Sequence, residues 1–197
     1  VLHDMLPDAP RYTSGYCPDE ARWARGWDIR TSFLQHIPIA QSHHRWFVGL
    51  MPYAFEQFDF SQYDLVLTIT SAEAKGIITT PHTLHVCYLL TPTRYLWSHH
   101  TDYAHGLLKP LQQFIFSRLR IWDFHAGLRP DHYIVISQLV KQRCEKYYRR
   151  TVDAVVYPPF RALVENVPQR STQPSCIIVS RLVGYKNIEL AIRAVAK

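Results

Sequence analysis

Short apolar runs alternate with helical periods along most of the chain, and polar or proline-containing loops separate them. The clearest apolar runs predict buried strands at residues 64–70, 82–90, 131–137, 153–157 and 176–179. Apolar positions with a 3.6-residue period predict helices within 103–122, at 138–149 and from 188 onward. Because the strands are separated by helices, the sequence predicts an α/β fold built on a parallel sheet.

The first forty residues are richer in loops. Short strands are expected within residues 8–13 and 30–34, the second of them closed by Pro38. At the other end, the polar segment 166–175 contains Pro168 and Pro174 and predicts a linker between two domains. We therefore expect a first domain at 1–165 and the beginning of a second domain at 176–197.

The chain has 197 residues, which suits one α/β domain but is short for two. It begins with Val1, and no helix stop signal follows Val195. These features lead us to expect an internal fragment or an incomplete gene product. Its first domain would lack the true start, and its second domain would be truncated.

The formal net charge is +6, which suits nucleic acid, anionic lipid or phosphorylated ligands equally. The cations at 141–150 are expected to form a solvated helix face, and no recognition motif accompanies them, so nucleic acid is not an expected partner. Residues 103–122 combine apolar and basic positions. A core-facing helix is favoured there, and a shallow contact with anionic lipid is the alternative.

Four widely spaced cysteines form no C-x-x-C pair, which argues against a zinc ribbon or a redox motif. Cys87 and Cys176 fall in predicted strands, so buried free thiols in a reducing cytoplasm are expected. No apolar run is long enough to span a bilayer. The expected location is cytoplasmic, with peripheral contact at the inner face of the plasma membrane as an alternative. The adjacent His43 and His44 lack partners at metal-ligand spacing, so no metal site is predicted.

A polar loop with two cations, Arg181 and Lys186, follows the predicted strand 176–179. Asn187 is a suitable N-cap for the next helix, and Glu189 suits its first turn. A helix N-terminus favours phosphate, and two cations add charge-assisted contacts. The pattern alone leaves two readings equally open: an anion site, or two solvated loop cations.

The phrase from Ser180 to Asn187, with the Glu-Leu-Ala-Ile helix after it, resembles the start of the donor domain in glycosyltransferase family 4, whose members have the two-domain GT-B fold. Gly184 stands where the family usually has Pro. Other phrases agree with the family in the same order. They are Tyr12-Thr13-Ser14, Thr31-Ser32-Phe33-Leu34-Gln35, residues 71–76, Tyr88 to Trp97, residues 137–149 and 155–159. The resemblance covers nearly the whole chain from Tyr12 onward and implies two Rossmann-like domains.

The resemblance implies transfer of a hexosyl group, with mannosyl as one option, in polysaccharide biosynthesis. The donor would be a nucleotide diphosphate sugar, and the acceptor a lipid-linked or saccharide molecule. Transfer would retain the anomeric configuration without a metal or cofactor. Arg181 and Lys186 would hold the diphosphate and stabilise it as it leaves. Because such a site forms between two domains, the chain alone is expected to be inactive.

Further candidates lie in the first domain. Ser71 is expected to cap a one-turn helix that Gly76 ends, with Lys75 exposed, and the resemblance would place Ser71 and Lys75 beside the cleft. Thr91, Arg94 and Tyr95 follow the strand 82–90.

Arg94 either packs its stem on the aromatic rings of Tyr95 and Trp97 or clamps an anion. Leu90 stands where the family has His, so no catalytic base is assigned. The alternative function is a catalytically inactive carbohydrate- or anion-binding module of the same fold.

Overall fold

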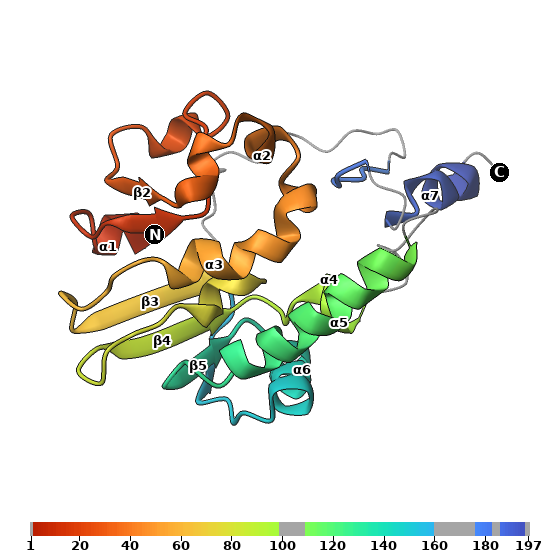
Figure 1. The fold of residues 1–197 in the computed structure, drawn as a ribbon. Coiled ribbons are helices and arrows are strands. Elements are labelled where there is room, and N and C mark those ends of the chain that lie inside the picture. Colours follow the sequence, from red (N-terminus) through yellow and green to blue (C-terminus); the bar gives the residue numbers. More distant parts are fainter. Residues whose placement is uncertain (1, 99–108, 160–175, 183–185, 196–197) are drawn as a thin grey trace. The chain divides into compact units, whose positions relative to one another are not determined.

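The computed structural model describes residues 2–98, 109–159, 176–182 and 186–195 (Figure 1). The chain divides into two compact units, Val1–Pro159 and Phe160–Lys197. The predicted linker 166–175 lies outside the described residues.

The first unit contains a four-stranded sheet in the order β3-β4-β5-β6, and every neighbouring pair is parallel. Its strands are β3 (Leu65–Thr70), β4 (Leu84–Leu89), β5 (His132–Val135) and β6 (Ala154–Val155). Each falls inside a predicted apolar run. The prediction of an α/β fold built on a parallel sheet is therefore confirmed.

Two longer helices follow β4 and β5. Helix α5 (Lys109–Ala126) carries Pro110 in its first turn, where the missing N–H has no partner to lose. Helix α6 (Gln138–Tyr148) begins at Ser137, whose side-chain oxygen accepts the Val140 N–H at 3.3 Å. The helix ends one residue earlier than expected because Arg149 adopts a left-handed conformation, with φ 55°.

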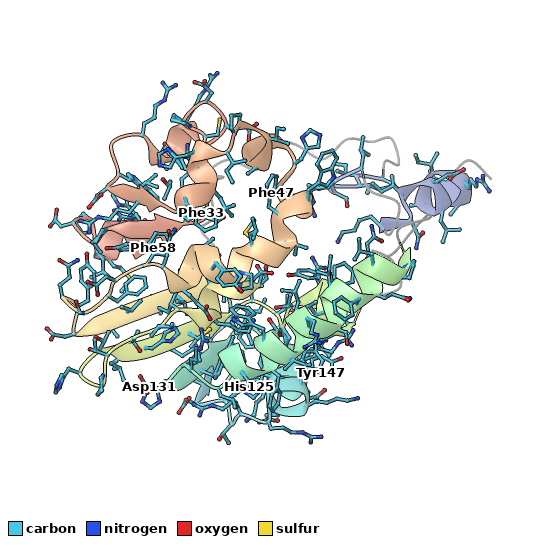
Figure 2. The ribbon with its side chains drawn as sticks, in the orientation of Figure 1. Phe33, Phe47, Phe58, His125, Asp131 and Tyr147 are labelled. Carbon is cyan, nitrogen blue, oxygen red and sulfur yellow. The ribbon has the colours of Figure 1, made fainter. Side chains whose placement is uncertain are left out.

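The main core lies between the sheet and α6. Buried side chains of β4 and β5 pack there with one face of α6, which contributes Val140, Cys144 and Tyr148. Two side chains fix the register of the strands: Asp131, labelled in Figure 2, accepts the backbone N–H of His85 at 2.8 Å, and Asp153 accepts that of Tyr133 at 2.8 Å.

Short helices occupy the turns of this unit. They are α3 (Met51–Glu56), the 3-10 helix η4 (Glu73–Gly76) and α4 (Arg94–Trp97). Gly76 is required where η4 meets α5, because a Cβ atom there would lie 2.6 Å from Cζ2 of Trp122. Glu56 connects α3 to α5 and to the segment after it. Its carboxylate accepts a hydrogen bond from Nε1 of Trp122 at 2.9 Å and one from the guanidinium of Arg129 at 2.6 Å.

The amino-terminal part forms a second, two-stranded parallel sheet from β1 (Arg11–Thr13) and β2 (Ile29–Thr31). Strand β1 lies within the predicted range 8–13, whereas β2 begins one residue before the predicted range 30–34 and ends at Thr31, since a 3-10 helix follows at Phe33–His36. Pro38 does not close β2 but opens helix α2 (Pro38–Ser42). The other elements here are α1 (Leu2–Met5) and the 3-10 helices η1 (Arg22–Ala24), η2 (Phe33–His36) and η3 (His44–Leu50).

In the second unit, helix α7 (Ile188–Val195) is present as predicted, with Glu189 in its first turn. The predicted strand at 176–179 is wrong, since residues 176–182 form neither strand nor helix and are exposed. A strand needs a hydrogen-bonded neighbour, and the described part of this unit contains no other strand. Cys176 is consequently exposed, against expectation, whereas Cys87 is buried as predicted.

Candidate functional site

The carboxyl ends of β3 and β4 meet at one edge of the four-stranded sheet. The Leu90 N–H donates to the Thr70 carbonyl at 2.8 Å, so the segments 71–76 and 91–97 start side by side. Ligands of open α/β sheets commonly bind at such carboxyl ends. All five first-domain candidates leave the sheet at this edge.

Ser71 does not cap the helix that follows it. Helix η4 begins at Glu73 after Ala72, and no side chain caps it. Instead, Oγ1 of Thr70 accepts the Ala72 N–H at 2.9 Å and makes the turn. The cap prediction for Ser71 is wrong because the hydroxyl of the preceding threonine takes that role. Ser71 itself is exposed at the sheet edge.

Lys75 is fully buried, so the expectation of an exposed cation is wrong. Its ammonium donates to Oδ1 of Asp123 at 2.5 Å, to the Ala72 carbonyl at 2.8 Å and to Oγ1 of Thr93 at 3.2 Å. An ammonium has three donors, and these contacts use all of them. The ammonium of Lys75 therefore stabilises the protein interior and is not exposed to a ligand.

Asp123, on α5, is the centre of this buried network, which we call the Asp123 network. One carboxylate oxygen accepts Lys75 and the Thr93 hydroxyl, the latter at 2.7 Å. The other accepts Nε1 of Trp97 at 2.7 Å and the Tyr148 hydroxyl at 2.9 Å. Four donors can stabilise a buried carboxylate that would otherwise be costly. The network fixes the segment 93–97 against α5 and α6.

Sequence reasoning missed Asp123, although a signal was present. Asp123 lies four residues after Leu119, which is buried on the core face of α5. An acidic residue at a helical core position needs a buried partner, and the nearby aromatic and cationic residues supply it.

Arg94 and Tyr95 begin helix α4 and point to different environments. Arg94 is exposed. Tyr95 is half-buried, and its hydroxyl donates to Oε1 of Glu73. Burial raises the pKa of the Glu73 carboxyl, and burial together with that carboxyl raises the pKa of Tyr95. Glu73, which the sequence did not single out, is thus a buried acid beside the sheet edge.

Leu90 and Thr91 complete the edge. Both are partly exposed, and Leu90 extends the β3–β4 ladder by one bond. Oγ1 of Thr91 is buried, and no described residue gives it a hydrogen-bond partner. The structure therefore brings Ser71, Thr91 and Arg94 to one edge, while Tyr95 packs against Glu73.

Arg181 and Lys186 belong to the second unit, and both are exposed. Lys186 immediately precedes Asn187, whose carbonyl accepts the Leu190 N–H at 3.1 Å at the start of α7. Asn187 has φ 49°, a left-handed conformation that asparagine tolerates, and not the extended backbone of a usual N-cap. Gly184, the departure from the family phrase, lies outside the described residues.

Within residues 2–98, 109–159, 176–182 and 186–195, no group of three or more histidine, cysteine or acidic side chains is arranged to hold a metal ion. Nor does any helix in those ranges have both the length and the apolar character needed to cross a membrane.

Comparison of the chain with protein-family models, with curated proteins and with solved structures found no match.

Proposed function

We propose that this protein is a glycosyltransferase of the GT-B type that moves a hexosyl group from a nucleotide diphosphate sugar to a lipid-linked or saccharide acceptor. The observation that carries the proposal is the presence of two exposed cations, Arg181 and Lys186, in the sequence that precedes helix α7. The family resemblance assigns that pair to the diphosphate of the donor.

The chemistry fits this role. When the glycosidic bond breaks, negative charge grows on the departing nucleoside diphosphate. Fixed cations that meet more charge in the transition state than in the ground state lower the barrier. Arg181 offers a planar guanidinium that can bind two phosphate oxygens, and Lys186 offers a point charge. Two cations can carry this neutralisation without a metal ion.

The first unit would supply the acceptor side. Ser71 and Arg94 leave the carboxyl ends of neighbouring parallel strands and are exposed, so a polar group on the acceptor can meet one hydroxyl and one guanidinium there. Lys75 is withdrawn as a direct contact, because the Asp123 network uses its charge. Its role here would be to position the segment that bears Arg94.

Nucleotide binding tests the donor assignment. Calorimetric titration of the 197-residue chain with pyrophosphate and with uridine, guanosine and adenosine diphosphates measures the dissociation constants. Arg181→Ala and Lys186→Ala should each weaken diphosphate binding about tenfold, the loss of one charge-assisted contact worth about 1.4 kcal/mol. Arg193→Ala is the matched control. It removes an exposed cation of the same unit that lies on helix α7, where it pairs with Glu189 at 2.5 Å.

The outcomes separate the alternatives. Unchanged affinity in both donor-loop variants, within twofold of the wild type, would overturn the diphosphate assignment. Binding that depends on both cations, without transfer from any of the corresponding nucleotide sugars by a protein that contains both complete domains, would instead identify a carbohydrate- or anion-binding module. Where transfer is detected, each substitution should lower kcat/KM about a hundredfold.

A further inference from the structure

Helix α5 has two faces of opposite character. One face is buried, with Leu119 and Ala126 in the interior and Asp123 at the centre of its network. The other face is exposed and mostly apolar. Its side chains recur at alternating spacings of three and four residues, which places them on one side of an α-helix. We call this face the α5 stripe, and its members are Leu111, Phe114, Arg118, Ile121 and His125, the last labelled in Figure 2.

The α5 stripe is long but narrow. Its apolar members Leu111, Phe114 and Ile121 are 55%, 59% and 57% exposed. At a rise of about 1.5 Å per residue the stripe is about 21 Å long, and a helix is about 10 Å wide, which gives a contact area of roughly 200 Å². A stable protein–protein contact takes about 800 Å² from each partner. The stripe alone is therefore too small to hold a second copy of the chain or another protein.

The charges on this face favour an anionic partner. Asp123 is the only acidic residue of helix α5, and it is fully buried. The charged members of the stripe are Arg118 and, when protonated, His125. A second copy of the stripe would place cations against cations, with no carboxylate between them, so charge opposes self-association through this face.

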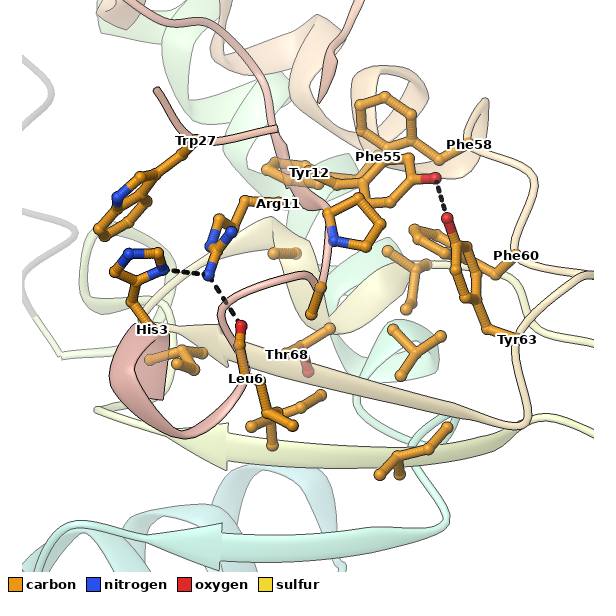
Figure 3. Close-up of a pocket in the computed structure, with 18 of the residues that line it drawn as sticks. His3, Leu6, Arg11, Tyr12, Trp27, Phe55, Phe58, Phe60, Tyr63 and Thr68 are labelled. Carbon is orange, nitrogen blue, oxygen red and sulfur yellow. Dashed lines mark hydrogen bonds between the residues drawn. The ribbon is translucent and has the colours of Figure 1, made fainter. Parts of the chain in front are cut away.

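The guanidinium of Arg118 is available for an external contact. It lies over the ring of Phe114, 5.3 Å from the ring centroid, and no described residue accepts a hydrogen bond from it. Arg11, which lines the pocket drawn in Figure 3, provides a contrast. It lies 4.6 Å over the ring of Trp27 but donates to the Leu6 carbonyl at 2.9 Å. Arg11 is thus used within the fold, whereas Arg118 can meet an anion outside it.

A cation in the middle of an apolar stripe restricts the surfaces that the stripe can contact. A purely apolar groove would bury the Arg118 guanidinium without an acceptor, which is costly. The boundary of an anionic bilayer supplies both environments. Acyl chains receive the apolar side chains, and a long cationic side chain reaches the phosphates at the level of the headgroups.

We propose that the α5 stripe docks this protein on an anionic lipid bilayer, with α5 lying in the plane of the headgroups. Leu111, Phe114 and Ile121 enter the boundary of the acyl chains, and Arg118 donates to lipid phosphates. The opposite face of α5 stays in the protein interior, so docking requires no unfolding. Such docking is independent of the proposed transferase activity, since it needs neither a donor nor an acceptor.

Co-sedimentation of the 197-residue chain with sucrose-loaded vesicles tests this contact. The probe vesicles contain phosphatidylcholine and phosphatidylglycerol in a ratio of about 2:1, and vesicles of phosphatidylcholine alone are the reference. The chain should bind the anionic vesicles about tenfold more tightly than the neutral ones, because cations near an anionic surface add to the apolar contact.

Two variants separate the apolar contribution from the cationic one. Ile121→Ser places less apolar area in the bilayer, and Arg118→Glu replaces a cation by an anion. Each should weaken binding to the anionic vesicles about tenfold. The matched controls lie on α6: Leu139→Ser, at a leucine that is 54% exposed, and Lys146→Glu, at an exposed lysine. Both controls should bind within about twofold of the wild type, since exposed charges distant from the contact are screened.

Four outcomes would overturn the proposal. Equal binding to both kinds of vesicle, or to neither, would exclude a contact with anionic lipid. Equal losses in the α5 variants and the α6 controls would show adhesion through the net charge of +6 instead of the stripe. A loss in Arg118→Glu without any in Ile121→Ser would show that α5 does not enter the bilayer. A dimer in sedimentation that Ile121→Ser dissociates would assign the stripe to a second copy of the chain. None of these outcomes bears on diphosphate binding by the second unit.

Discussion

The ammonium of Lys75 lies 2.5 Å from a carboxylate oxygen of Asp123, and both side chains are fully buried. The two residues are 48 positions apart in sequence and connect η4 to α5. Burial of two charges is costly, and the cost is offset here because every ammonium proton and both carboxylate oxygens have partners.

We predict that removal of one partner destabilises the fold strongly. Asp123→Ala leaves a buried ammonium without its counter-charge and should lower the free energy of unfolding by about 3–5 kcal/mol. Urea denaturation followed by circular dichroism measures this change. The double variant Lys75→Met with Asp123→Leu removes both charges and should recover a large part of the loss.

The exposed pair Lys141 and Glu145, 3.9 Å apart on α6, provides the control. Glu145→Ala should change the free energy of unfolding by about 0.5 kcal/mol or less, because such helical surface pairs are weak. A similar small effect for Asp123→Ala would show that the Asp123 network does not hold this region.

The fold could be predicted further than the site. The strands β3 to β6 are short apolar runs between clear breakers, and Ser137 marks the start of α6, so local pattern sufficed there. The prediction of a strand at 176–179 was wrong because four apolar residues do not indicate whether a neighbouring strand exists. The predictions for Lys75 and Ser71 were wrong for a similar reason. Their environments depend on Asp123 and Thr70, and spacing in sequence does not reveal such contacts.

His85 should make stability depend on pH. Its side chain is fully buried, Nε2 lies 3.0 Å from Oγ1 of Thr68, and burial lowers its pKa to about 4. Between pH 6.5, the ordinary pKa of histidine, and about pH 4, the His85 side chain is protonated in the unfolded chain but neutral in the folded chain. The stability that His85 contributes by staying neutral is therefore complete above pH 6.5 and is lost as the pH falls from about 6.5 to about 4.

The measurement is the free energy of unfolding at pH 7 and pH 5 for wild type and His85→Gln. The wild type should lose up to about 1.4 kcal/mol per pH unit more than the variant. His82→Gln, at an exposed position beside the same strand, should keep the wild-type slope. Identical slopes in wild type and His85→Gln would contradict a neutral buried imidazole.

Gly76 should not tolerate a methyl group. In Gly76→Ala the new Cβ would lie 2.6 Å from the Trp122 ring and 3.1 Å from Cβ of Ala126, so η4 and α5 must separate. We expect a loss of about 1–3 kcal/mol in the free energy of unfolding. Gly49→Ala is the matched control, since nothing lies within 4 Å of its added Cβ and it should cost less than 1 kcal/mol. Equal costs for the two variants would exclude overpacking as the cause.

The cysteines should differ in reactivity. Burial raises the pKa of Cys87 to about 11 and that of Cys144 to about 12, and neither thiol is accessible. Cys176 is exposed. Iodoacetamide at pH 8, with peptide mass spectrometry, should label Cys176 at least a hundredfold faster than Cys87 or Cys144, because the thiolate is the reactive form. Labelling of all three at one rate in the native protein would contradict the buried core of the first unit.

The four donors that meet at Asp123 come from four separate places: η4, the turn before α4, α4 itself and α6. Helix α4, which carries Arg94, is held by Thr93 before its start and by Trp97 at its end, so it opens only when two buried donors leave the Asp123 carboxylate. Such an opening costs more than the fraying of a segment that one exposed hydrogen bond holds. Arg94 would meet a ligand as a preorganised group on a rigid base.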